Sequence, residues 1–582
     1  MPVGNNFRRT CLMRKKLATN VIDQEIVRAR LDGIVREMQA AVLRTGYSTI
    51  IRESHDFSAG ITDHEGNVVG QHSPLPTHLG AYPDCVKGVL TYYSLDQMKE
   101  GDCFLPNHPY FSGCPHPNDM VVMMPVFADN EVIAFCASMG HKVDIGGQSP
   151  GSRNAGARDL FGEGLSILPV KFMDQRVLLP EVVQFLKSNT RTPELVLGDL
   201  EAQAGALWSI GIKRLADVVR TYGKDAVLDS FKGLGDRTES RARQVISTWL
   251  DGSAEAEAFI DDIARPGETI RLHVKAIKKG DQLTLDFSGS GEQSAGPVNA
   301  RPPFVRGMVH YAAIAMMDSS IPNNYGLGRA IESKFKDGTV ICPTFPAPVG
   351  FYSMTMPVVE DIIFEALSKI SGKPEVAHNS VSGMLVLGAT GAEAKRYVQY
   401  EIIVSGNGAY NGGDGYTGTG HSWTGGAKYT GVEIIESEFP VEMQQFNLVV
   451  DSGGPGKYRG GLALRREYRV KTNAQYSGGT PRTLVPAHGV LGGGNGKAGK
   501  VRLNPGTDNE RLFEGLVSNV ALSAGDVVCM ETASAGGSGS PEDRDQAKIV
   551  SDLRNGYITA ITAEHVYGLS KSDIDAALAI PD

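Results

Sequence analysis

The stretch GCPHPNDMVVMMPVFADNEVIAFCASMGH, residues 113–141, contains two short apolar runs, Val121–Val126 and Val132–Ala137. Each run is bounded by Gly, Pro or Asn, which is typical of buried strands joined by loops. Runs of this kind recur from residue 50 to residue 175. We therefore predict a strand-rich N-terminal part with residues 113–141 at its centre.

Polar residues at the two ends of this stretch could bind a metal ion. His116 and Asp119 are three residues apart, so a turn can bring them to one ion, and His141 follows His116 by 25 residues, about one hairpin away. Two imidazoles and one carboxylate leave an open coordination position, as a catalytic zinc or similar divalent ion requires. Asp56, in the segment SHDFS, is a candidate fourth ligand.

Two further residues could support such a site. Asp144 and His78 could orient the ligand rings by hydrogen bonds or carry a proton during catalysis. A plainer interpretation also fits the spacing, because His and Asp three residues apart are common. In that interpretation His116 and Asp119 satisfy loop backbone groups and His141 caps a strand. The concentration of His between residues 55 and 141, seven of the chain's 13, favours the metal site.

The rest of the chain alternates between helical and strand-like patterns. We predict an α+β fold, a multi-segment composite body with the metal site in its N-terminal α/β part and a Gly-rich, mainly β C-terminal half. The predicted regions are 1–190 with the metal site, 191–265 helical, 266–380 mixed α/β, and 381–582 mainly β with a C-terminal helix. The expected elements are a long helix at 20–47, helices at 193–250, a hairpin at 268–288 turning at Lys279–Asp281, a helix at 300–318, strands at 380–530 and helical turns at 545–569.

Composition excludes several classes of protein. The chain has 582 residues, 41% of them hydrophobic, and a net charge of −9, so clustered basic residues for nucleic-acid binding are not expected. The one basic run, between Arg8 and Lys16, is short and is interpreted as a solvated tail. No apolar stretch is long enough to predict a membrane span or a secretory signal. The seven Cys occur singly, which fits free thiols in a reducing cytoplasm.

Two familiar catalytic motifs do not occur in the sequence. The Gly runs at 411–415, 453–461 and 492–496 lack the Lys-Ser/Thr of a phosphate loop, and there is no GxSxG nucleophile elbow. Cys114 could be a nucleophile because His116 is near in sequence, although a small thiol that lines the loop is the plainer interpretation. We therefore expect any ATP-dependent step to take place on a partner.

Long sequence blocks carry a family resemblance. The blocks are SHDFSAGITDHEGNVVGQHSPLPTHLGAYP at 54–83, GDCFLPNHPYFSGCPHPNDMVVMMPVF at 101–127, GHKVDIGGQSPGS at 140–152, LFGEGLSILPVK at 160–171, DSGGPGKYRGGLALRREY at 451–468 and AGGSGSPEDRDQAKIVSDLRNGYIT at 535–559. Through these blocks the chain resembles hydantoinase B/oxoprolinase subunits along nearly its whole length.

The resemblance implies a function and a partner. Family members pair with a hydantoinase A-type subunit that binds ATP and Mg, as an expected A2B2 heterotetramer, and open hydantoins, N-methylhydantoins, 5-oxoproline or larger lactams. The metal ligands are implied at His116, Asp119 and His141, with Asp56 a further one. Zinc is implied for the lactam hydrolases and manganese for the distantly similar acetone carboxylases.

The implied reaction is ATP-dependent hydrolysis of a cyclic amide. The partner would phosphorylate the amide oxygen or bicarbonate, and the metal would supply hydroxide or polarise the carbonyl. The alternatives are ATP-dependent carboxylation of a ketone, a purely structural platform and an autonomous hydrolase. Two departures from the family pattern, Asn107-His108-Pro109-Tyr110 for Asn-Asp-Pro-Tyr and Cys114-Pro115 for Gly-Thr, lie beside the predicted site and leave the substrate open.

Overall fold

A computed structural model describes residues 21–72, 78, 80–390, 396–420 and 424–579. Its first layer is a seven-stranded antiparallel sheet with the order β2-β1-β5-β4-β3-β6-β7. The basic run between Arg8 and Lys16 lies outside the described residues. The strands are β1 Phe57–Asp63, β2 Val68–His72, β3 Cys103–Leu105, β4 Asp119–Ala128, β5 Glu131–His141, β6 Val170–Asp174 and β7 Val177–Leu178.

Both faces of this sheet are covered, which explains why its central strands are apolar at nearly every position. Met120, Val122 and Met124 of β4 belong to a core formed with the long helices on one face. Val121 and Met123 belong to a second core on the opposite face, as the two-residue period of a strand requires. The helices on the first face are α1 Val21–Thr45, α5 Pro193–Ala206, α6 Lys213–Tyr222 and α7 Lys224–Ile246, with a π-helical turn at Leu207–Ile212 between α5 and α6.

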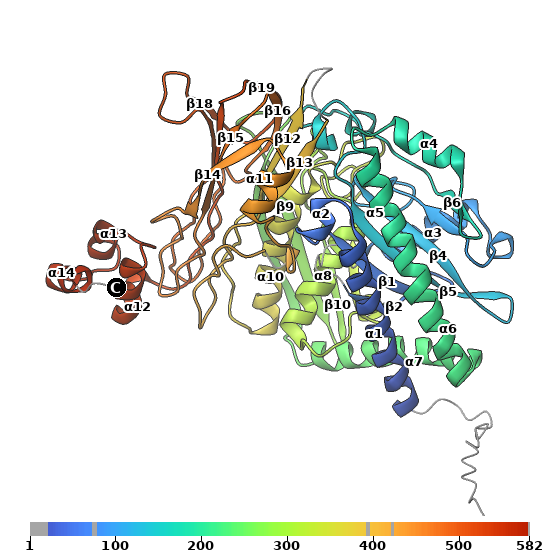
Figure 1. Ribbon diagram of the computed structural model, residues 1–582. Helices are drawn as coiled ribbons and strands as arrows, with labels where there is room; N and C mark the ends of the chain where they lie inside the picture. The colour runs from blue at the N-terminus through green and yellow to red at the C-terminus, as the bar shows by residue number, and fades with distance from the viewer. Residues whose placement is uncertain (1–20, 73–77, 79, 391–395, 421–423, 580–582) are drawn as a thin grey trace, which may run out of the picture.

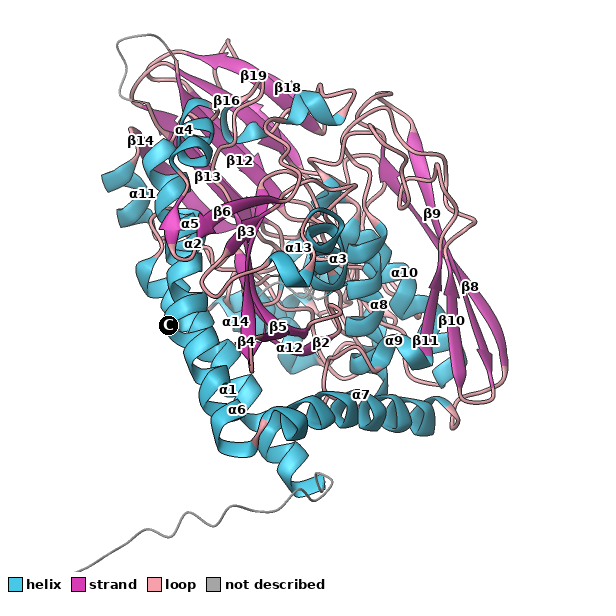
Figure 2. Cartoon of the chain, turned by 90° about the vertical axis from the view of Figure 1, so that its right-hand side faces the viewer, coloured by secondary structure: helices cyan, strands magenta, loops and turns pink. Residues whose placement is uncertain are grey.

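A second layer of helices separates this sheet from another. The helices α8, Pro302–Met317, and α10, Met356–Ser371, pack against each other, and α10 also packs against a four-stranded sheet. That sheet has the order β11-β10-β9-β8 and lies at the right of Figure 2. Its strands are β8 Gly252–Asp261, β9 Thr269–Lys279, β10 Gln282–Asp286 and β11 Ile331–Lys334.

The C-terminal half is a β-sandwich with its own core. Leu385, Leu387 and Tyr476 of one sheet share an apolar cluster with Tyr468 and Met530 of the other. The sheet orders are β13-β12-β16-β19 and β14-β15-β20-β17-β18. The strands are β12 Gly383–Ala389, β13 Val398–Ile403, β14 Val441–Leu448, β15 Leu464–Val470, β16 Ala474–Gly479, β17 Lys500–Leu503, β18 Arg511–Phe513, β19 Leu516–Leu522 and β20 Val527–Glu531.

Glycines allow loops of this half to pack backbone against backbone. A Cβ atom on Gly408 would lie 1.7 Å from the carbonyl oxygen of Ala377, and one on Gly415 would lie 2.0 Å from that of Asn407. Such contacts admit no side chain. They explain the high glycine content after residue 400.

Three short helices end the described chain and project from the sandwich in Figure 1. They have a small apolar core of their own. Arg544 holds them to the sandwich through ion pairs with Asp414 and Asp552, both at 2.7 Å. The helices are α12 Gln546–Arg554, α13 Ala560–His565 and α14 Lys571–Leu578. The shorter helices elsewhere are α2 Thr49–Arg52, α3 Tyr82–Tyr92, α4 Pro180–Ser188, α9 Leu327–Ala330 and α11 Val432–Glu438.

The predicted α+β composite fold is confirmed. Among the described residues, no helix is both long and apolar enough to cross a lipid bilayer. The four-region division stays a prediction. The helices after residue 190 cover the N-terminal sheet, and the four-stranded sheet begins with β8 at Gly252, before the expected boundary at 265.

Candidate metal centre

The strand register brings three chain segments together at one end of the N-terminal sheet. Asp119, the first residue of β4, lies directly opposite His141, the last residue of β5. On the other side of β5, Phe57 pairs with Gly140, and the His141 backbone N–H donates to the Asp56 carbonyl at 3.1 Å. Residues far apart in sequence therefore meet at one end of the central strands, because the β4–β5 hairpin opens there and β1 begins beside it.

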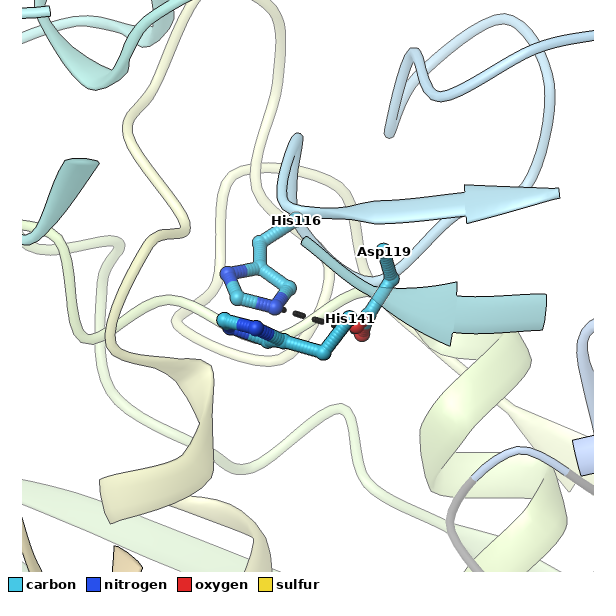
Figure 3. Close-up of side chains that lie close together, drawn as sticks. All are labelled: His116, Asp119 and His141. Carbon is cyan, nitrogen blue, oxygen red and sulfur yellow. Dashed lines mark ion pairs between the residues drawn. The ribbon is translucent and has the colours of Figure 1, made fainter. Parts of the chain in front are cut away.

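His116 completes the cluster from the loop before β4. Its Nε2 atom is 3.2 Å from Oδ2 of Asp119, and its ring centroid is 5.1 Å from that of His141. Figure 3 shows the two rings and the carboxylate converging on a common space. His116, Asp119 and His141 form one group that could hold a metal ion, and Asp56, His78 and Asp119 form a second group that shares Asp119.

His78 lies behind Asp119. Its Nε2 atom is 3.7 Å from Oδ2 of Asp119, and its Nδ1 atom is 3.1 Å from the hydroxyl of Ser58. The Ser58 hydroxyl in turn lies 2.8 Å from that of Tyr82. A chain of buried polar contacts therefore fixes the His78 ring against the carboxylate.

Two asparagines hold the loop that carries His116. The Asn107 side chain donates to the carbonyls of Pro117, at 2.6 Å, and Leu165, at 2.8 Å, and accepts from the Ile167 backbone N–H. Asn118 donates to the carbonyls of Lys142 and Gly151. These buried bonds determine where the loop enters β4.

Burial and neighbouring charges set the protonation of the cluster. Burial lowers the pKa of His116 and holds that of His141 well below the ordinary value, so both imidazoles are neutral. Burial opposes ionisation of Asp119, but His116 and His78 outweigh it and hold the pKa of this carboxyl well below its usual range. Burial and then the Asp119 charge raise the pKa of Asp56 to about 7. Neutral imidazoles beside an ionised carboxylate are the protonation state that metal ligands require.

Unpartnered atoms provide a test of whether the residues fit a metal. Nδ1 of His116, Oδ1 of Asp119 and Nδ1 of His141 are buried and have no hydrogen-bond partner within the protein. Leaving buried polar atoms unpaired is costly, and three of them belong to one side-chain cluster. A divalent cation bound by this cluster would pair with the donor atoms that face it. Nitrogen and carboxylate oxygen donors suit zinc or manganese, so the donor set fits the ion that the sequence predicts.

The cluster faces a small cavity of about 30 Å³, enough for roughly two water-sized groups. Tyr352 and Tyr400 pack against the rings of His116 and His141, with centroids 5.2 and 4.6 Å apart. The cavity lies between the N-terminal sheet and the C-terminal sandwich, and is lined by Asp56, His116, Asp119, His141, Arg153, Tyr352, Ser353, Met354, Ser382, Gly383, Met384, Ile402 and Thr424.

Sequence reasoning missed the cavity residues outside the metal cluster. Arg153 immediately follows the block at 140–152, but no spacing rule marks it. Tyr352, Ser382 and Met384 lie more than 200 residues from His141. Only the packing of the sandwich and of the segment before α10 against the sheet brings them to the cavity, so a sequence pattern holds no local signal for them.

Asp144 lies among loop backbones and does not line the cavity. Its carboxylate accepts hydrogen bonds from the backbone N–H groups of Gly146 and Gly151, both at 3.0 Å, and from Arg191. It thereby shapes the loop that leads to Arg153. Its predicted part in proton transfer stays a prediction, and its contacts favour a positioning role.

Cys114 is fully buried and also does not line the cavity. Its Sγ atom lies 3.8 Å from the carbonyl oxygens of Pro106 and Ser112. This position favours the interpretation as a small thiol that fills the loop over the interpretation as a nucleophile.

Comparison with known proteins identifies relatives along nearly the whole chain. The family model described as hydantoinase B/oxoprolinase matches residues 20–541. Caprolactamase subunit beta of Pseudomonas jessenii is 28% identical over 559 residues, which cover 94% of this chain and 95% of that one.

Two solved structures share the fold. The ATP-dependent caprolactamase from Pseudomonas jessenii superimposes with a TM-score of 0.86 at 26% identity, covering 97% of this chain and 99% of that chain. A nucleotide-free acetone carboxylase superimposes with a TM-score of 0.85 at 18% identity, covering 96% of this chain and 82% of that chain, and shows likeness of fold alone.

Proposed function

The chain belongs to the hydantoinase B/oxoprolinase family, and from this premise we propose that it is the metal-binding subunit of an ATP-dependent cyclic-amide hydrolase. Its substrate would be a hydantoin, an N-methylhydantoin or a lactam. The observation that carries the proposal is the convergence of His116, Asp119 and His141 on one cavity, in a cluster that also leaves buried polar atoms without hydrogen-bond partners.

A separate ATP-binding subunit is part of the proposal. The Pseudomonas jessenii relative is named as a subunit, and the similar solved structure is described as ATP-dependent. The free-energy change for opening an unstrained cyclic amide by hydrolysis is close to zero, so coupling to ATP hydrolysis on the partner would make ring opening favourable. We propose that the partner is an A-type subunit in an A2B2 assembly.

The side chains of the metal centre would have different roles. His116, Asp119 and His141 would bind the ion, and Asp56 would be a further ligand. Zinc is the proposed ion and manganese the alternative. When bound, the ion would lower the pKa of a coordinated water or polarise the substrate carbonyl. His78 would hold Asp119 in place through the 3.7 Å contact between Nε2 and Oδ2.

The cavity residues would exclude water and orient the ring. Tyr352 lines the cavity beside His116, and Tyr400 packs against the His141 ring. Met354 and Met384 add adaptable apolar surface to the cavity. Because a ring is larger than the free space in the cavity, we expect the ring to displace the surrounding walls. Substrate size would therefore depend on residues 382–384 at the start of the sandwich and on residues 352–354 before α10.

The test uses the chain purified together with its A-type subunit. Ring opening and ADP release are measured with hydantoin, N-methylhydantoin, 5-oxoproline and caprolactam in turn. We expect one of these to be opened with ATP consumption, and His116→Ala to abolish turnover. His565→Ala, at an exposed residue of α13, is the matched control and should retain it. Turnover that persists after complete removal of the metal would reject the proposal.

A second incubation, with a ketone in place of the cyclic amide, distinguishes hydrolysis from carboxylation. The same preparation is incubated with ATP, labelled bicarbonate and acetone or acetophenone. Label in an organic acid, without opening of any ring, would replace hydrolysis by ketone carboxylation. Activity without ATP from this chain alone would show an autonomous hydrolase.

A further inference from the structure

Arg153 differs from the other buried arginines of the described chain because it forms no ion pair. Five arginines in the described part of the chain are buried. Four of them form ion pairs with carboxylates, namely Arg459, Arg466, Arg482 and Arg544. Within the same part of the chain, no carboxylate forms an ion pair or hydrogen bond with Arg153, although it is only 3% exposed.

The contacts of Arg153 hold its guanidinium without neutralising it. Nε donates to the Tyr400 hydroxyl at 2.8 Å, Nη1 donates to the Gly350 carbonyl, and Nη2 also reaches the Tyr400 hydroxyl. The ring of Phe351 lies 5.2 Å below the guanidinium carbon. Neutral oxygens and an aromatic face orient the fork but supply no opposite charge.

The guanidinium faces the metal cluster. Nη2 of Arg153 lies 3.5 Å from Nε2 of His141, and Arg153 lines the same cavity as His116 and Asp119. The surrounding structure fixes this position. The Glu163 carboxyl accepts hydrogen bonds from the backbone N–H groups of Val349 and Gly350. It thereby fixes the position of the Gly350 carbonyl, to which Arg153 donates.

The charges around the cavity do not balance once a divalent ion is bound. Of the charged residues that line the cavity, Asp56 and Asp119 would balance a dication, and the positive charge of Arg153 would be left over. Burying a charge without a partner is unfavourable, so an anion beside Arg153 would complete the balance of the lining. A guanidinium fork matches the geometry of carboxylate and phosphate oxygens.

We propose that Arg153 anchors a small oxyanion beside the metal ion, so that the group which reaches this centre is anionic. This inference rests on the proposed metal site and adds the charge class of its ligand. The free space beside the cluster has room for a small group, which fits bicarbonate, a carboxylate or a single phosphoryl group. Arg153 would bind two of its oxygens and orient the group toward the metal.

The experiment measures anion binding, not turnover. The full-length chain is loaded with zinc, freed of excess metal, and titrated calorimetrically with inorganic phosphate and, separately, with bicarbonate. We expect binding of at least one anion at one per chain, and the arm that binds distinguishes phosphoryl from carbonate chemistry. Losing the charge-assisted bonds in Arg153→Met should weaken that binding roughly 10- to 100-fold.

Two further variants make the result specific. Arg153→Lys keeps the charge without the fork, so its binding should lie between those of the wild type and Arg153→Met. Arg158→Met removes an exposed arginine five residues away and should bind like the wild type. Metal content is measured for every variant, and we expect one ion per chain throughout.

The outcomes separate the two proposals. A wild-type chain that holds no metal overturns the proposed function. Two results would overturn only the proposal that Arg153 anchors an anion. One is a metal-loaded wild-type chain that binds neither anion. The other is an Arg153→Met or Arg153→Lys chain that keeps its metal and binds the anion as tightly as the wild type.

Discussion

Asp119 and His141 are cross-strand partners at the open end of the β4–β5 hairpin. Because opposite residues of an antiparallel pair have their Cβ atoms about 5 Å apart, the hairpin register alone brings a carboxylate and an imidazole within reach of one ion. A shift of one residue would turn one of them to the opposite face. The metal centre therefore depends on strand pairing more than on its loops.

Asp56 gives the first prediction. Its carboxyl belongs to the group formed with His78 and Asp119 and lines the cavity. We expect Asp56→Asn to weaken zinc binding by at least roughly 10-fold, because an acidic donor is replaced by a neutral amide. Competition with a chelator of known affinity measures the change. Asp96→Asn, at an exposed residue, should leave the affinity unchanged, and equal affinities in all three proteins would remove Asp56 from the ligand set.

Asn107 gives the second prediction, on the loop that presents His116. Asn107→Asp keeps the shape of the side chain but cannot donate to the Pro117 and Leu165 carbonyls. Two buried acceptors would face a carboxylate, and we expect a loss of roughly 2–4 kcal/mol in unfolding free energy together with weaker zinc binding. Chemical denaturation and metal titration measure both. The exposed Asn509→Asp is the control, and a variant as stable as that control would show that Asn107 does not hold the loop.

The N-terminal part of the fold followed from sequence patterns because they are local. The apolar runs at 121–126 and 132–137 lie within β4 and β5, and the predicted helix at 20–47 coincides with α1 over the described residues. His116, Asp119 and His141 converge because they flank one hairpin, so spacing was informative. Their role as metal ligands stays a prediction.

The rest of the site could not be predicted for a physical reason. Tyr352 reaches the cavity, and Tyr400 reaches the His141 ring, through packing between segments more than 200 residues apart, and periodicity carries no information about such contacts. Asp144 is near His141 in sequence, yet its carboxylate faces the loop backbone at Gly146 and Gly151. Proximity in sequence indicates which loop a residue belongs to, but not which way its side chain points.

Close backbone packing gives the third prediction. Gly408→Ala would place a Cβ atom 1.7 Å from the Ala377 carbonyl oxygen, so we expect it to prevent folding of the sandwich or to lower the melting temperature by more than about 5 °C. Gly205→Ala, on the exposed face of α5 with nothing within 4 Å of the added atom, should instead stabilise by roughly 0.5–1 kcal/mol. Thermal melts compare the two, and a Gly408→Ala protein as stable as the wild type would contradict the packing.

Largely buried His310 on α8 gives the fourth prediction, on acid stability. Burial, and secondly the charge of Arg306, lower the pKa of His310 from 6.5 to about 4. Between these values the unfolded chain binds a proton that the folded chain does not, so stability falls as the pH drops from 6.5 towards 4, by up to roughly 3 kcal/mol. The His310→Gln variant should not show this contribution to the loss of stability at low pH.

Denaturation at pH 7 and at pH 4.5 measures this difference. His565→Gln, at an exposed residue, should follow the wild type. If His310→Gln loses as much stability on acidification as the wild type, then a lowered pKa of His310 does not contribute to acid sensitivity, and the prediction is contradicted.

The central claim is that His116, Asp119 and His141 together hold one divalent cation. Elemental analysis of the isolated chain, purified without chelators, tests it most directly, with His116→Ala, Asp119→Asn and His141→Ala beside the exposed His565→Ala. We predict about one ion per chain in the wild type and in His565→Ala, and less than about 0.1 in the other three. A folded wild-type chain without stoichiometric metal, or full metal content in all three site variants, would contradict the account.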